Sequence, residues 1–170
     1  KKWWGGRVTK KTDPYFEKFS ASIDTDCRLA AQDLIGSFLH VHVLRGAGLI
    51  TVADFARLKK GILTLLDQVE KGAFAYDFSC EDIHTNIQIE LAKIAGASAK
   101  KLQTCRSRND QVVFATKLYC LMNGPELQEA IFQVRKSLIA WGALHSSLVM
   151  PGYTHMQHAQ PVYLKDYLMA

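Results

Sequence analysis

Apolar residues recur at steps of three and four along much of the chain, which is the spacing of an amphipathic helix. One such run follows Thr51, where an acidic residue three positions further on completes the pattern of a helix N-cap. Its apolar positions extend from Phe55 to Val69. Because glycine commonly follows the last turn of a helix, the pattern predicts a helix that ends near Gly72.

Two further runs predict helices in the first half of the chain. One starts after Ser79, carries apolar residues on one side from Ile83 to Ile94, and stops at Gly96. The other covers Thr25–Gly46 and places its larger apolar residues near one face: Leu34, Phe38, Val41 and Leu44.

The strongest periodicity lies in the second half of the chain. Steps of four and three continue over three heptads, as in a helix packed lengthwise in a bundle. This seam consists of Leu127, Ile131, Val134, Leu138, Trp141, His145 and Leu148. Asn123-Gly124-Pro125 interrupts the apolar pattern before it, and a proline inside a helix kinks or breaks it. Two helices and one bent helix both fit this pattern.

No segment has the alternation of a β-strand, so the chain is predicted to be all-α, with Trp3 to Ile23 irregular. The final apolar run, Tyr163 to Ala170, stops in mid-pattern without a cap or a glycine. We therefore expect the bundle to continue beyond residue 170, in the rest of a longer protein.

The composition adds a broad class and a compartment. Apolar residues make up 48% and charged residues 22%, the balance of a soluble globular protein. The net charge of +5 is mild and suits a small anionic substrate as well as a nucleic acid. Nothing in the sequence besides this charge indicates nucleic-acid binding. The four cysteines form no CxxC pair, and no apolar run approaches the about 18 residues of a membrane span. We expect a cytoplasmic protein.

The first candidate site is the segment Arg106-Ser107-Arg108-Asn109-Asp110-Gln111, where a loop turns into a helix. Helix amides and guanidinium groups in such a place can bind carboxylates. A solvated, well-capped helix start explains the same residues equally well.

The second candidate site is Met150–Gln157, a predicted loop because of its proline and glycine. Thr154 and His155 place a hydroxyl beside a group that titrates near neutral pH, which suits proton transfer. On these residues alone, a loop histidine bonded to backbone is the simpler interpretation.

Three weaker signals involve the other histidines. Glu81-Asp82-Ile83-His84 opens a predicted helix, where acids suit the helix dipole whatever the function. His155 and His158 lack a supporting carboxylate or cysteine at metal-ligand spacing, so we expect no metal site. His145 lies on the seam, where we expect it to be packed.

These segments occur in the order found in a known family. In sequence they are Trp4-Gly5-Gly6-Arg7, Ser22-Ile23 with Asp26, Gly36-Ser37, Glu81 to His84, Arg106 to Gln111, and Pro151 to Pro161. Over essentially its whole length the chain resembles the argininosuccinate lyase and δ-crystallin family, of the fumarase/aspartase superfamily.

The resemblance implies an all-α fold in which residues 1–108 form a helical N-terminal domain and residues 109–170 begin a long-helix bundle domain. It also implies a homotetramer whose active sites combine residues of several subunits. The heptad seam agrees with such an assembly.

The resemblance further implies the reaction, a β-elimination that splits argininosuccinate into arginine and fumarate in arginine biosynthesis. This reaction uses neither a metal nor an organic cofactor. By resemblance, Ser22, Arg108, Asn109 and Thr154 bind the substrate. His155 transfers a proton, as acid or base, and His84 supports the site from nearby.

The family's other proton-transfer group is a serine on a mobile loop that has no match here, so we expect the 170-residue chain alone to be inactive. Four positions depart from the family pattern: Ser20, Gln103, Cys105 and Asp166. If the backbone at Cys105 needs a positive φ, the loss of the family's glycine costs about 1 kcal/mol. A non-catalytic, δ-crystallin-like protein and another fumarate-releasing lyase of the superfamily are the alternatives.

Overall fold

The computed structural model describes residues 12–170, which form two compact units. The first unit ends at Cys120 and the second is Leu121–Ala170. The Trp4–Arg7 motif lies outside the described residues. Whether the domain boundary of the whole protein falls near residue 108 stays a prediction.

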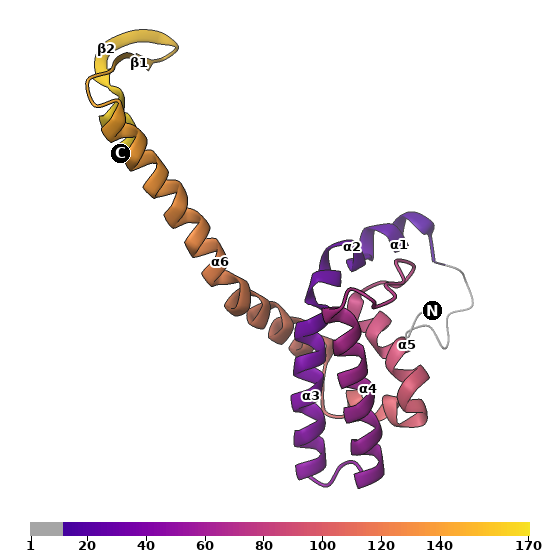
Figure 1. Ribbon diagram of the computed structural model, residues 1–170. Coiled ribbons are helices and arrows are strands. Elements are labelled where there is room, and N and C mark those ends of the chain that lie inside the picture. Colours follow the sequence, from indigo (N-terminus) through magenta and orange to yellow (C-terminus); the bar gives the residue numbers. More distant parts are fainter. Residues whose placement is uncertain (1–11) are drawn as a thin grey trace. The chain divides into compact units, whose positions relative to one another are not determined.

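The first unit is built from helices (Figure 1). Around its core, α3, α4 and α5 pack against one another. The elements in order are α1 (Pro14–Ser20), α2 (Ile23–Asp26), the 3-10 helix η1 (Cys27–Leu29), α3 (Ala30–Gly46), α4 (Val52–Glu70), α5 (Ile83–Ala95), the 3-10 helix η2 (Gly96–Gln103) and the beginning of α6 (Arg108–Leu144).

The helix expected after Thr51 is confirmed as α4. The Thr51 hydroxyl accepts a hydrogen bond from the Asp54 N–H, and the Asp54 carboxylate accepts one from the Thr51 N–H, which is a complete capping box. Gly72 has a φ of 66° just beyond the last turn. Leu58, Ile62 and other apolar residues of the predicted stripe face the core.

The other two helices of the first half are also confirmed. Asp82 caps α5 by accepting a hydrogen bond from the Thr85 N–H, and Gly96 ends it with a φ of 58°. The run Thr25–Gly46 is helical throughout, as the end of α2, then η1 and α3. Together with α4 these helices enclose an apolar core that includes Leu34, Val41, Leu44, Leu58, Ile62, Leu65, Ile83, Ile87 and Leu91.

The prediction that Trp3 to Ile23 is irregular was wrong for the described part, because α1 occupies Pro14–Ser20. Asp13 accepts a hydrogen bond from the Tyr15 N–H, and Pro14 stands at the first helical position, where its missing N–H costs nothing. The helix buries none of its residues, so apolar periodicity could not reveal it.

The segment with the proline is one helix, since α6 runs through Pro125 for 37 residues. It ends at Leu144, so His145 and Leu148 of the seam lie beyond it. The seam residues on α6 are exposed, from 37% at Leu138 to 64% at Leu127. The His145 ring packs edge-on against Trp141, with 5.6 Å between ring centroids.

The expected loop at Met150–Gln157 is instead most of a hairpin, so the expectation of no strands was wrong there. Strand β1 (Val149–Thr154) pairs antiparallel with β2 (Gln157–Tyr163), with a bulge between Pro151 and Tyr153. A two-stranded ribbon has only edge strands, which tolerate proline. Its residues are mostly exposed on both faces. The sequence therefore lacks the alternation of apolar and polar residues by which a half-buried strand is recognised. A last helix, α7 (Leu164–Met169), follows.

The all-α class is otherwise confirmed, since the elements of residues 12–170 are helices apart from this hairpin. None of the helices in that range has the combination of length and apolar character needed to cross a membrane.

Asp54 links the α4 cap to η2, and this link should make stability depend on pH. Its carboxylate accepts hydrogen bonds from Lys101 Nζ at 2.6 Å and Ser98 Oγ at 2.9 Å. The hydrogen bond from Lys101, followed by those from Thr51 and Ser98, holds the pKa of Asp54 well below its usual value. A depressed pKa stabilises the fold above the unfolded-state pKa of about 4, and the contribution disappears as the pH falls below it.

We therefore expect Asp54→Asn to lower the thermal midpoint at pH 7 and to flatten its decline between pH 5 and 3. Thermal unfolding of both proteins across this range measures the effect. Equal declines in the two proteins would contradict it.

Candidate active site

The Arg106–Gln111 segment consists of the end of a loop and the first turn of α6, which begins at Arg108, and its side chains divide into two groups. Ser107 and Asp110 cap the helix: the Asp110 N–H donates to Ser107 Oγ, and the Ser107 N–H and Oγ donate to Asp110 Oδ2. Arg106, Arg108 and Gln111 instead contact other helices of the first unit. The well-capped helix start is therefore confirmed for Ser107 and Asp110, whereas carboxylate binding by the arginines stays a prediction.

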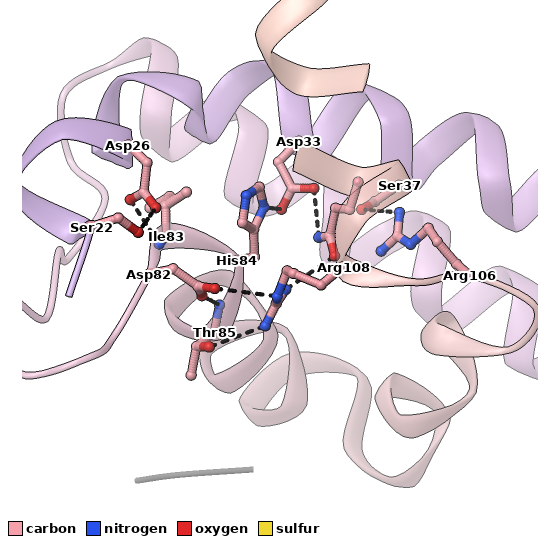
Figure 2. A network of polar contacts seen from close by, with 11 residues as sticks. Ser22, Asp26, Asp33, Ser37, Asp82, Ile83, His84, Thr85, Arg106 and Arg108 are labelled. Atoms are coloured by element: carbon pink, nitrogen blue, oxygen red, sulfur yellow. Dashed lines mark hydrogen bonds and ion pairs between the residues drawn. The ribbon is translucent and has the colours of Figure 1, made fainter. Parts of the chain in front are cut away.

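The Arg108 guanidinium is held at all three nitrogens (Figure 2). Nε lies 3.2 Å from Asp82 Oδ2, one terminal nitrogen donates to Thr85 Oγ1 at 3.1 Å, and the other donates to Gln111 Oε1 at 3.0 Å. The Arg108 side chain is still 35% exposed. The group is therefore fixed in direction and open to a ligand.

Behind Arg108 lies a buried polar cluster. The Gln111 side-chain amide donates to Asp33 Oδ1 at 2.6 Å. His84 Nδ1 lies 3.1 Å from Asp33 Oδ2, which is an ion-pair distance without the alignment of a hydrogen bond. The side chains of Asp33 and His84 are each 1% exposed. His84 thus lies beneath the accessible surface of this unit, beside Asp33 (Figure 2).

Arg106 is the second cation of the cluster. One of its terminal nitrogens donates to Ser37 Oγ at 3.2 Å. Burial lowers the pKa of the Arg106 guanidinium, while the Asp33 carboxylate acts in the opposite direction. Asp33 therefore serves as a counter-charge inside the unit.

Ser22 lies at the start of α2 and is exposed. Its hydroxyl donates to Asp26 Oδ2 at 2.6 Å, and Asp26 Oδ1 accepts from the Ile83 N–H at 3.0 Å. The Ser22 N–H donates to the Glu81 carbonyl at 2.8 Å. These bonds join the Ser22 segment to the first turn of α5, where Asp82 and His84 lie.

A cleft of about 600 Å³ opens beside these residues. Its walls include Arg108, Asp82 and Thr85 with the apolar side chains of Ile23 and Phe78. Asn109 occupies the exposed side of the first turn of α6. In the first unit the structure therefore places Ser22, His84, Arg108 and Asn109 at the starts of three helices, α2, α5 and α6.

The second unit carries the other predicted residues at the tip of the hairpin. Thr154 Oγ1 and His155 Nδ1 are 2.7 Å apart, and Tyr153 OH lies 2.7 Å from His158 Nε2. His155 and Met156 have φ values of 50° and 60°, the backbone of a two-residue turn that glycine or asparagine would adopt more easily. Strain of this kind is common at functional sites. His155 is exposed.

Among residues 12–170, no three His, Cys, Asp or Glu side chains come together as metal ligands would.

Sequence reasoning missed Asp33 and Thr85, and it did not assign a role to Asp82. Asp33 did leave a signal, because it stands four positions before Ser37 on the face of α3 that also carries Val41. A charged residue on a buried face requires a partner. Thr85 gave no comparable signal, because its role depends on where α6 begins.

The chain belongs to the lyase family, whose profile matches residues 6–170. Its relatives include the argininosuccinate lyases of Moorella thermoacetica, 41% identical over 169 residues, and of Desulfatibacillum aliphaticivorans, 40% identical over 167 residues. These alignments cover 99% and 98% of this chain but 36% of each relative. The resemblance read from the sequence is confirmed.

A solved structure of an EDDS lyase variant with bound fumarate has the same fold, with a TM-score of 0.63. It is 23% identical, and the match covers 95% of this chain and 32% of that one.

Cys105, which directly precedes the Arg106–Gln111 segment, has a φ of 56°. Its backbone therefore adopts the left-handed conformation that favours glycine. The preceding Thr104 carbonyl lies 2.9 Å from His40 Nε2, which holds the loop in place. Relieving the strain should make Cys105→Gly more stable than the parent protein by about 1 kcal/mol.

The matched control is Cys120→Gly, because Cys120 is an exposed residue within α6. There glycine should destabilise by about 0.5–1 kcal/mol. Denaturant midpoints of the two variants measure the contrast, and a shift in the same direction for both would refute the strain at Cys105.

Proposed function

We propose that the full-length protein is an argininosuccinate lyase, a carbon–nitrogen lyase that eliminates fumarate from argininosuccinate and leaves arginine. The identity of about 40% with argininosuccinate lyases over essentially the whole chain carries this proposal. The chain spans a little over a third of the length of these relatives. The proposal therefore concerns the protein of which these residues form one part.

Arg108 binds a substrate carboxylate in this proposal. A guanidinium has five N–H donors, two of them on each terminal nitrogen. Gln111 Oε1 and Thr85 Oγ1 each accept one from a different terminal nitrogen, so each terminal nitrogen keeps one further donor. Asp82 Oδ2 lies 3.2 Å from Nε, at ion-pair distance. Two donors match the two oxygens of one carboxylate, and the partners already hold the guanidinium in a fixed direction.

Ser22 and Asn109 supply neutral hydrogen bonds to the same substrate, and the Ser22 oxygen does so as an acceptor because its O–H donates to Asp26 Oδ2. Both are exposed, and Asn109 extends from the first turn of α6, where the helix dipole favours an anion. His84 is buried beside Asp33, so it supports the site by packing behind it.

His155 transfers the proton, and Thr154 binds substrate beside it. Elimination removes a proton from the carbon next to a carboxylate, places negative charge on that carboxylate, and protonates the departing guanidinium nitrogen. The contact between Thr154 Oγ1 and His155 Nδ1 orients the imidazole and leaves its Nε2 available for the reaction. Both side chains are exposed at the hairpin tip, as an approach to a ligand requires.

The protein acts as a homotetramer in this proposal, with each active site built from residues of neighbouring copies. The exposed apolar residues along α6, such as Leu127, Ile131 and Val134, support burial against other copies. The four cysteines are all free thiols, which is consistent with the reducing cytoplasm.

The test is the release of fumarate, followed by its ultraviolet absorbance, when argininosuccinate is added to the full-length protein. We expect turnover, and we expect His155→Asn to lower kcat by about 10²–10⁴-fold because general acid–base catalysis is lost. His42→Gln is the control, because His42 packs between Phe38 and Phe55 away from the site.

A folded tetramer that releases no fumarate would overturn the proposal and favour a structural role. Release of fumarate from a different amino-acid adduct, but not from argininosuccinate, would indicate another lyase of the superfamily.

The 170-residue chain alone should produce no fumarate, because the family's second proton-transfer group is not among its residues. The same assay at equal site concentration measures this. Turnover by the short chain would show that residues 1–170 are sufficient.

A further inference from the structure

Gln111 lies between two groups of opposite hydrogen-bonding character. On one side is the Asp33 carboxylate, which can only accept, at 2.6 Å from Gln111 Nε2. On the other is the Arg108 guanidinium, which can only donate, at 3.0 Å from Gln111 Oε1. The side chain is buried, with 5% of Gln111 exposed.

Only one orientation of the Gln111 amide satisfies both neighbours. With its NH₂ group toward Asp33 and its oxygen toward Arg108, both contacts are hydrogen bonds. Rotating the amide by half a turn would oppose donor to donor and acceptor to acceptor. Gln111 is buried, so water could not screen the repulsion between these mismatched groups. The rotated amide would therefore cost more free energy here than it would at the surface.

We propose that Asp33 is a positioning residue, whose charge fixes the Gln111 amide and through it the direction of Arg108. The inference rests on the proposed role of Arg108 in binding a substrate carboxylate. Asp33 does not itself reach the cleft, since it is 1% exposed. It acts through one intermediate side chain.

Asparagine at position 33 is the variant that removes the constraint with little change of shape. An asparagine can present either a donor or an acceptor, so it no longer selects one orientation of Gln111. When the Gln111 amide is rotated, Arg108 loses the Gln111 oxygen as an acceptor and faces the Gln111 NH₂ group, which is a donor. The guanidinium then has fewer fixed partners, and its two substrate-facing donors are less well directed.

A second substitution should restore the pattern. In the double variant Asp33→Asn/Gln111→Glu, the carboxylate introduced at position 111 accepts from the amide introduced at position 33 on one side and from Arg108 on the other. The cluster keeps one carboxylate, so Arg106 also keeps a counter-charge nearby. The double variant therefore exchanges the acid and the amide while preserving the sequence of donors and acceptors.

The experiment compares four full-length proteins: the parent, Asp33→Asn, the double variant, and Asp54→Asn. The last removes a similarly buried carboxylate whose partners are Thr51, Ser98 and Lys101, so it controls for loss of stability. For each protein we would measure kcat and KM for argininosuccinate. We would also measure the rate at which phenylglyoxal modifies Arg108, by mass spectrometry of the proteolytic peptide that contains Arg108.

We expect Asp33→Asn to raise KM about tenfold, the effect of one hydrogen bond to a charged group, with a smaller change in kcat. Phenylglyoxal should modify Arg108 several times faster, because its guanidinium is less restrained. The double variant should return both values to within about threefold of the parent, and Asp54→Asn should change neither.

The proposal is overturned if Asp33→Asn leaves both KM and Arg108 reactivity unchanged, or if the double variant is no better than the single one. Failure of the proposed function is a separate outcome. If the parent protein releases no fumarate, Arg108 reactivity still reports whether Asp33 controls its restraint.

Discussion

The burial of the Asp33 carboxylate in the first unit is the constraint on which the arrangement of the polar side chains around it depends. Burying a charge is costly unless other groups compensate it, and here they come from α5, from α6 and from the loop before α6. Removing any one of them would leave part of that cost unrelieved. The contacts around Asp33 therefore connect α3 to α5 and to the beginning of α6, which carries Arg108.

The apolar pattern and the cap residues predicted the helical framework because both signals are local. Thr51 with Asp54, and Gly72 and Gly96 at the helix ends, each specify a boundary through bonds or backbone angles within a few residues. The elements that were missed bury little. Helix α1 has no buried residue, and the hairpin exposes most of both faces, so neither leaves a periodic trace.

The residues of the candidate site came from the family resemblance, but their contacts could not be predicted from the sequence. Family resemblance indicated Arg108 and His155, yet nothing in the linear order shows that Thr85 or Asp33 lies beside the Arg-Ser-Arg segment. Those contacts join residues far apart in the chain and exist only after the helices pack. Within the segment itself, Ser107 and Asp110 satisfy backbone amides of the helix start, while Arg108 and Gln111 contact residues of other helices.

The turn at His155 and Met156 has a consequence for engineering. His155 and Met156 both have left-handed backbone conformations, which residues other than glycine and asparagine adopt only with strain. A procedure that ranks substitutions by backbone preference would therefore replace both residues with glycine or asparagine. Such a protein would gain heat resistance and lose the imidazole. If His155 transfers the proton as proposed, attempts to stabilise the protein should therefore leave His155 and Met156 unchanged and alter residues away from the candidate site, where backbone strain and proton transfer do not compete.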